Sequence, residues 1–167
     1  KYFLILTFLV AIGPIKGFNE IRENNRLKTE AKAYWEAGEF AKAAEIYAQL
    51  TARLPEDEAL AMNLAHSLYR SDNIEGATAA YSRLARSTDA ATRAAASMQL
   101  GVMSAKKKAY KEALSAFKSA LKAEPYNEEA RYNYELVKKL MEEDDFEAVF
   151  KEMKDTNHIK DILNGIN

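Results

Sequence analysis

The chain has 167 residues, with 24 Lys and Arg against 25 Asp and Glu, 48% apolar residues, 6 Gly, 3 Pro and no Cys. This length suits one domain of about 100 to 200 residues with a buried core. The lack of cysteine excludes disulfide frameworks, thiolate zinc sites and cysteine nucleophiles. A formal net charge of −1 lacks the basic excess that nucleic-acid binding needs. Frequent alanine with so little Gly and Pro predicts an all-α fold of closely packed helices.

An apolar run, broken only by Thr7, opens the chain at residues 2–13. It is too short for a membrane-spanning helix, which needs about 20 residues, but it has the length of the apolar part of a secretory signal. We therefore expect residues 1–17 to be a signal peptide or an N-terminal membrane anchor, with the domain exported to the periplasm or anchored in the inner membrane. For an uncleaved anchor, the basic residues that follow favour a cytoplasmic domain instead. These residues are Lys16, Arg22, Arg26, Lys28 and Lys32.

A motif recurs three times in the middle of the chain, at spacings of 34 and then 36 residues. In each copy an apolar residue is followed three places later by Ala, and four places after that by an aromatic residue. All three positions fall on one face of a helix, where Ala lets a neighbouring helix approach and the aromatic ring fills the space beside it. The alanines are Ala43, Ala77 and Ala113, and the aromatic residues are Tyr47, Tyr81 and Phe117.

Each copy is preceded by a second apolar stripe, so the repeating unit is predicted to be a helical hairpin. Gly38 is expected to end the first helix in a left-handed conformation, and Pro55 prevents the second helix from continuing. Pro125 closes the third unit in the same way. Such a unit cannot bury both of its faces alone, so stacking against its neighbours provides the core.

The stretch Gly38-Glu-Phe-Ala-Lys-Ala-Ala-Glu-Ile-Tyr47, with Pro55 after it, resembles the second helix of a tetratricopeptide repeat. Leu100-Gly101, followed by the third copy of the motif, resembles the same family. The resemblance implies a right-handed α-solenoid of three helical hairpins plus a C-terminal capping helix, within a domain at 18–140. The hairpins are expected at 24–57, 58–91 and 94–127.

The second repeat departs from the family pattern at two positions. Asp72 stands where the turn glycine is expected, and Asp89 stands where the closing proline is expected. Two extra residues separate the second and third repeats, and we expect the loop at 86–89 to contain them.

Asn127 is expected to cap a last helix at 127–140, which has acidic residues in its first turn and seals the end of the solenoid. The run Glu-Glu-Ala-Arg-Tyr-Asn-Tyr-Glu-Leu at 128–136 also resembles the ending of small repeat proteins of the Bacteroides aerotolerance (Bat) group. These are exported or membrane-tethered proteins associated with von Willebrand A-domain proteins.

The family resemblance implies a concave groove, made mainly by the first helices, that binds an extended peptide or a partner's helix. Its basic entrance and its aromatic, thioether and amide groups suit a partially apolar segment with an acidic group at one end. In the alternative interpretation Trp35 and Tyr69, or Met62 and Met98, are packing residues. The groove residues by this register are Lys28, Lys32, Trp35, Met62, Asn63, His66, Tyr69, Met98, Gln99, Val102 and Lys106.

Some members of the family bind a terminal carboxylate through a clamp of Lys and Asn side chains with two further cations. Lys28 and Asn63 match two clamp positions, but Lys32 replaces an Asn, and Ala95 and Gln99 replace the two cations. Without these charge-assisted hydrogen bonds the clamp loses its selectivity. We therefore expect a different mode of recognition.

Residues 141–167 form an acidic amphipathic tail with eight acids and three bases. It is expected to fold back near the basic groove entrance, to dock on a partner, or to stay disordered until binding. His66 and His158 have no paired metal ligand at helical spacing, and no phosphate loop or dinucleotide fingerprint is present. We therefore expect no catalytic residues, no metal and no cofactor.

These features predict a non-enzymatic scaffold or adaptor that binds protein partners at the bacterial cell envelope and helps to assemble a membrane-associated complex. The narrower resemblance implies von Willebrand A-domain membrane proteins as partners. Two alternatives remain: a self-assembling structural protein and a cytoplasmic adaptor anchored in the membrane. No nucleic-acid partner is expected, and homo-oligomers are compatible with all three hypotheses.

Overall fold

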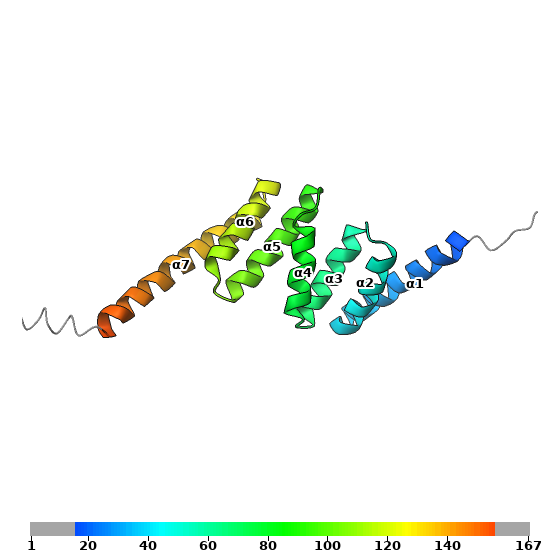
Figure 1. Cartoon of the computed structure of the whole chain (residues 1–167), viewed down its shortest axis with the longest axis horizontal. Helices are drawn as coiled ribbons and strands as arrows, with labels where there is room; N and C mark the ends of the chain where they lie inside the picture. Colours follow the sequence, from blue (N-terminus) through cyan, green and yellow to red (C-terminus); the bar gives the residue numbers. More distant parts are fainter. Residues whose placement is uncertain (1–15, 156–167) are drawn as a thin grey trace, which may run out of the picture. The chain divides into compact units, whose positions relative to one another are not determined.

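The structure is a computed structural model that describes residues 16–155, and these residues form α-helices joined by short loops (Figure 1). The prediction of an all-α fold is confirmed. Residues 1–15 of the expected signal peptide or anchor, and residues 156–167 of the expected tail, lie outside the described part. The helices are α1 (Lys16–Glu36), α2 (Phe40–Arg53), α3 (Glu58–Arg70), α4 (Ile74–Leu84), α5 (Ala90–Lys106), α6 (Tyr110–Ala123) and α7 (Glu128–Asp155).

The helices divide into two compact units, one ending at Asp72 and the other beginning at Asn73. In the first unit α2 packs on both α1 and α3. In the second unit α6 packs on both α5 and α7, and α4 packs on α5. The pairs α1–α2 and α5–α6 are therefore hairpins at the places expected for the first and third repeats.

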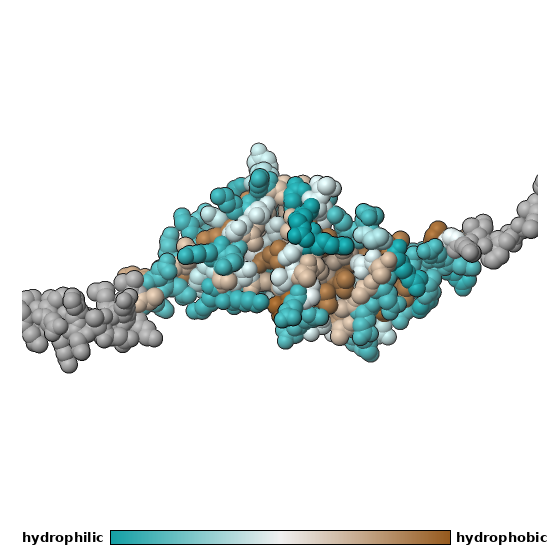
Figure 2. Space-filling view, viewed as in Figure 1, coloured by the Kyte–Doolittle hydropathy of each residue, from teal (hydrophilic) through white to brown (hydrophobic). Residues whose placement is uncertain are grey.

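The positions that define the repeat are buried. Ala43, Ala77 and Ala113 are fully buried, and the aromatic residues four places later are almost so. Phe117, for example, is only 1% exposed. Hydrophilic residues cover much of the face seen in Figure 2. The predicted roles of the repeated alanine and aromatic residues are confirmed.

The turn inside each repeat has one residue in the left-handed region. These residues are Gly38 (φ 77°), Asp72 (φ 65°) and Lys108 (φ 57°), which follow the repeat spacing. At the first turn, Glu39 N–H donates to Tyr34 O (2.9 Å), and at the third, Ala109 N–H donates to Ser104 O (3.0 Å). This bond is typical of a helix end with a left-handed residue. The prediction for Gly38 is confirmed.

The boundary between the second and third repeats differs from the expectation. Helix α5 begins at Ala90, ahead of the expected start at 94, so the extra residues lengthen the start of this helix. Asp89, which replaces the expected proline, caps α5 by accepting a hydrogen bond from Thr92 N–H (2.7 Å). This hydrogen bond lowers the pKa of the Asp89 carboxyl. Arg93 Nη1 donates to the carbonyls of Ser87 (2.6 Å) and Thr88 (3.2 Å) and so holds the preceding loop.

The cap expected at Asn127 is present, because its Oδ1 accepts a hydrogen bond from Ala130 N–H (2.9 Å). The helix that it caps does not end at residue 140 but continues to Asp155. The first part of the expected tail is therefore helical. Its Asp144 lies 3.5 Å from Nζ of Lys108, at the turn between α5 and α6. None of the described helices is both long enough and apolar enough to cross a membrane.

Candidate functional site

A hollow of about 270 Å³ opens on the first unit. Helices α1 and α3 each supply two of its residues at a spacing of three, which places both on one helix face. Helix α2 supplies a tyrosine that is only 7% exposed. Four of these residues are among those expected in the groove, and the tyrosine was expected only in the core. The lining residues are Lys32, Trp35, Tyr47, Asn63 and His66.

Trp35 forms an aromatic wall of this hollow. Its ring is half-buried against the core of the first unit and meets the Phe40 ring edge-on, with centroids 4.9 Å apart. The guanidinium carbon of Arg70 lies 4.3 Å from the Phe40 centroid and 6.0 Å from the Trp35 centroid. Trp35 is therefore both a packing residue and a lining residue, and its neighbours hold the indole ring in place.

Burial shifts the pKa of two titratable groups in the hollow toward their uncharged forms. It lowers the pKa of the His66 imidazole and raises the pKa of the Tyr47 phenol. Lys32 then supplies the charge among the lining residues. Its Nζ lies 3.6 Å from Oε1 of Glu36, and because both side chains are exposed, this ion pair is weak.

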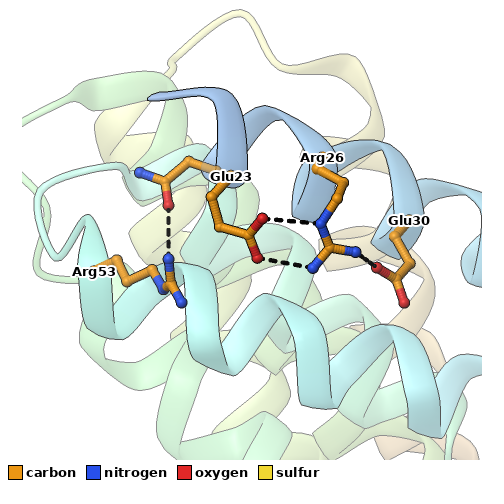
Figure 3. Close-up of polar contacts among 5 residues, drawn as sticks. Glu23, Arg26, Glu30 and Arg53 are labelled. Carbon is orange, nitrogen blue, oxygen red and sulfur yellow. Dashed lines mark hydrogen bonds and ion pairs between the residues drawn. The ribbon is translucent and has the colours of Figure 1, made fainter. Parts of the chain in front are cut away.

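Two of the cations expected at the basic entrance, Arg26 and Lys28, pair with carboxylates of the chain, and Figure 3 shows the pairs of Arg26. Arg26 donates to both carboxylate oxygens of Glu23 (2.9 and 2.8 Å) and to Glu30 (2.7 Å). The hydrogen bond from Arg26 lowers the pKa of Glu23. Lys28 Nζ lies 3.3 Å from Oδ2 of Asp57. The helical spacing of α1 places Glu23 and Glu30 beside Arg26, and the loop before α3 places Asp57 beside Lys28.

A further contact in the same region joins α1 to α2. Arg53 Nη1 lies 3.5 Å from Oδ1 of the buried Asn24, and this contact is drawn in Figure 3. Arg53 and Asn24 therefore help to fix α1 against α2. Among the residues that line the hollow, Lys32 is the cation that α1 supplies.

The remaining residues of the expected groove do not line this hollow. Met62 and Tyr69 are half-buried on α3. Met98 is 5% exposed and packs in the core of the second unit with Phe117, so we assign it to the core and not to a binding surface. Val102 is half-buried against the same core, Gln99 is half-buried, and Lys106 is exposed at the end of α5.

A second, shallow depression of about 470 Å³ on the first unit includes Phe40, Lys42 and Arg70. Lys42 forms an ion pair with Glu39, which raises the pKa of the lysine, and its Nζ lies 5.2 Å from the Tyr34 centroid. The sequence pattern identified Phe40 only as the start of a repeat, and Arg70 carried no signal. Both become visible only when α1 and α3 are packed on α2.

The lining of the hollow has groups that suit binding. Among the described residues, no cluster of three or more His, Asp or Glu side chains could hold a metal ion. Every buried side-chain nitrogen or oxygen in the described part has a hydrogen-bond partner. The hollow combines an aromatic wall, an amide and a cation, which are typical of a surface that recognises a peptide.

Comparison with known structures shows the fold. The chain is similar to the crystal structure of the Sgt2 TPR domain from Aspergillus fumigatus, with a TM-score of 0.63 and 23% identity, over 74% of this chain and 82% of that chain. It is also similar to the first TPR of Spaghetti (RPAP3) bound to the HSP90 peptide SRMEEVD, with a TM-score of 0.61 and 18% identity, over 72% and 94% of the two chains.

Sequence comparison with curated proteins gives no match. A family model described as tetratricopeptide repeat, however, matches residues 28–92 and 62–128. These matches cover more than half of the chain and contain the three predicted repeats from Lys28 onward. The chain therefore belongs to the tetratricopeptide-repeat family and forms a protein–protein interaction domain of that family.

Proposed function

We propose that the hollow of the first unit binds an apolar side chain of an extended segment in a partner protein, with a carboxylate of the same segment beside Lys32. The observation that carries this proposal is the meeting of Trp35, Asn63 and Lys32 around one hollow. The indole ring provides apolar contact area in a fixed orientation. The exposed Lys32–Glu36 pair is weak, so an incoming carboxylate replaces Glu36 at little cost.

Recognition of a terminal carboxylate by a clamp is a weaker interpretation of the same surface. Lys28, which matches a clamp position, is bound to Asp57. Asp57 also caps α3, because its Oδ1 accepts a hydrogen bond from Leu60 N–H (3.1 Å). Release of Lys28 toward a ligand therefore disturbs a side chain that stabilises the start of α3. We accordingly assign the charge recognition to Lys32.

Trp35 is the only tryptophan of the chain, so its fluorescence reports directly on the hollow. Peptides selected from a random library on the full chain are titrated while the emission of Trp35 is followed. We expect the selected peptides to share an apolar residue next to an acidic one and to shift the emission. Peptides that bind without changing this emission contradict the proposal.

Two variants and one matched control make the test specific. Lys32→Glu and Asn63→Ala are each expected to weaken binding of the selected peptides by about fivefold or more, since each removes a polar contact. Lys118→Glu reverses another exposed lysine, on α6, and is expected to leave the affinity unchanged. Equal losses in Lys32→Glu and Lys118→Glu would indicate a general charge effect and no specific site.

The peptide SRMEEVD, which is bound in the similar RPAP3 structure, separates the two modes of recognition. A clamp binds it through its terminal carboxylates, and the binding is lost when the C-terminus is amidated. We expect weak binding of this peptide that is insensitive to amidation. Tight, amidation-sensitive binding assigns the surface to terminal carboxylates and contradicts the proposed mode.

We further propose that the partner belongs to a membrane-associated complex of the bacterial cell envelope. The apolar run at 2–13 supports this location, and the resemblance of residues 128–136 to Bat-group proteins supports von Willebrand A-domain proteins as partners. Protease treatment of intact spheroplasts tests the location, because only an exported domain is digested. A pull-down from solubilised membranes that returns no stable protein partner contradicts the complex.

A further inference from the structure

Helix α7 carries large apolar side chains on the face opposite to the one that packs. Ala130 and Val137 are buried in the core of the second unit. In contrast, Tyr132, Leu136 and Phe146 are 68%, 40% and 71% exposed. Figure 1 shows α7 continuing well past α6 in this unit. A row of exposed apolar residues on one helix face is typical of an interaction surface.

The exposed residues follow the spacing of a coiled-coil seam. The positions 132, 136, 139, 143 and 146 are separated by alternating steps of four and three residues, which keeps them on one stripe of a helix. The next position at this spacing, 150, is also a phenylalanine in the sequence. Lys139 and Glu143 occupy the middle of the stripe, and both are exposed. We call this set the α7 seam.

The α7 seam is symmetric about residue 141. Leu136 and Phe146 lie at equal distances from this point in the sequence, and so do Lys139 and Glu143. If two such helices lie antiparallel with a two-fold axis at residue 141, each apolar residue faces an apolar residue. Each charged residue of the seam then faces one of opposite charge.

We propose that two copies of this chain associate through antiparallel α7 helices, with the two-fold axis at residue 141. Leu136 of one copy then packs on Phe146 of the other, and Lys139 of one copy pairs with Glu143 of the other. Both copies use the same surface, and each contact occurs twice because of the two-fold axis, as in an isologous dimer. The pair Lys139–Glu143 already forms within each helix at 3.8 Å, so both side chains can turn to the second copy without a large movement.

The charges along α7 favour the antiparallel arrangement over the parallel one. Lys138 and Lys139 precede residue 141, whereas a run of acids from Glu142 follows it. In a parallel pair, the acidic run of one copy lies beside the acidic run of the other, and Lys139 of one copy lies beside Lys139 of the other. The antiparallel pair places the acidic run beside the lysines. One repulsive contact remains, between the two Glu142 residues near the axis, and it limits the affinity.

Sedimentation velocity of the full chain tests the association itself. We expect a reversible monomer–dimer equilibrium, with Glu142→Gln shifting it toward the dimer because the repulsive contact at the axis is removed. The competing occupant of the α7 seam is the chain's own segment 156–167. A monomer at all concentrations that dimerises only after deletion of 156–167 assigns the seam to that segment and overturns the proposal. A monomer in both forms also overturns it.

The absence of cysteine in the chain allows the register to be mapped by disulfide cross-linking. A mixture of Lys139→Cys and Glu143→Cys copies is expected to give a cross-linked dimer on mild oxidation. Each variant alone is expected to give much less, because residue 139 does not face residue 139 in the antiparallel register. Efficient cross-linking of Lys139→Cys alone indicates a parallel pair and overturns the proposal.

Charge reversal gives an independent test in solution. Lys139→Glu or Glu143→Lys alone creates two like-charge contacts and is expected to weaken the dimer about tenfold. The equimolar mixture of the two variants restores opposite charges and is expected to form a heterodimer, as the double variant restores the homodimer. Circular dichroism confirms that each variant is helical. Lys122→Glu, an exposed reversal on α6, is the control, and equal weakening by this control overturns the proposed register.

Discussion

A Cβ atom placed on Gly101 would lie 2.5 Å from Cε1 and 2.7 Å from Cδ1 of the Phe117 ring. Gly101 lies inside α5 and Phe117 inside α6, and the ring is 1% exposed. Helix α5 therefore approaches this ring more closely than a helix with any side chain at position 101 allows. At the corresponding position of the first repeat, Ala31 is fully buried in the same core as Tyr47.

We expect Gly101→Ala to destabilise the second unit by about 1 to 3 kcal/mol, because the added methyl group overpacks a core in which the Phe117 ring has no free space. The helix propensity of alanine opposes this loss by at most about 1 kcal/mol. Urea denaturation followed by circular dichroism measures the difference. Gly17→Ala is the matched control, since nothing lies within 4 Å of its added methyl group. A Gly101→Ala variant as stable as this control shows that the ring moves away freely.

The left-handed turn at Lys108 stores strain that glycine would release. A side chain in this conformation costs about 1 to 2 kcal/mol, and the greater flexibility of glycine in the unfolded chain offsets part of the gain. We expect Lys108→Gly to raise the stability by up to about 1 kcal/mol, although it removes the ion pair with Asp144. That pair is exposed and contributes little.

The neighbouring Lys107 provides the control for this turn. Its φ of −89° lies in the ordinary region, so Lys107→Gly gains no relief and is expected to lower the midpoint of thermal unfolding. Asp72→Gly is expected to give a smaller increase than Lys108→Gly, because aspartate tolerates the left-handed region better. Lower stability of Lys108→Gly than of Lys107→Gly would show that the lysine side chain has a structural role at the turn.

The sequence predicted those parts of the fold that depend on one position repeated in several copies. Ala43, Ala77 and Ala113 recur in register, and each is buried as expected. The turn at Gly38 was predicted because glycine favours a left-handed conformation. The turn at Lys108 was missed, since a run of three lysines gives no such signal and the conformation there is imposed by the packing of α5 on α6.

The candidate site was predicted less completely, because it depends on which side chains meet across helices. The register implied by the family resemblance placed Lys32, Trp35, Asn63 and His66 among the eleven expected groove residues, and these four line the hollow. It could not show that Asp57 binds Lys28, which depends on the position of the loop between α2 and α3 relative to α1. For the same reason Met98 was expected in the groove, whereas the close packing of α5 and α6 buries it.

Helix α6 begins at Tyr110, and its N-cap residue Ala109 provides no side-chain cap, whereas Asp57 and Asn127 cap α3 and α7. Glu112, three residues after Ala109, completes a capping box when position 109 is a serine. We expect Ala109→Ser to stabilise the second unit by about 0.5 to 1 kcal/mol. Ala95→Ser, at an exposed position inside α5, is the control and is expected to lose about 0.5 kcal/mol. Thermal unfolding compares the two variants, and a loss in both indicates that no capping box forms.

The pKa of His66 leads us to expect that the stability of the first unit depends on pH. Burial lowers the pKa of its imidazole below the ordinary value of about 6.5, so the unfolded chain binds a proton at this residue more readily than the folded one. Stability therefore rises with pH in the window between the two pKa values. The contribution of His66 to stability is fully present above about pH 6.5. This contribution falls as the pH drops from there toward the lowered pKa of the folded state.

The pH dependence is measured by urea denaturation between about pH 5 and 7.5, with the fluorescence of Trp35 reporting on the same unit as His66. The carboxyls of Glu23 and Asp89 have lowered pKa values and so act only at more acidic pH, outside this window. We expect His66→Asn to flatten the slope, because asparagine does not titrate. The other histidine, His158, remains in the variant and serves as the internal control. A slope that is unchanged in His66→Asn would assign the dependence to another group and contradict the lowered pKa of the half-buried His66.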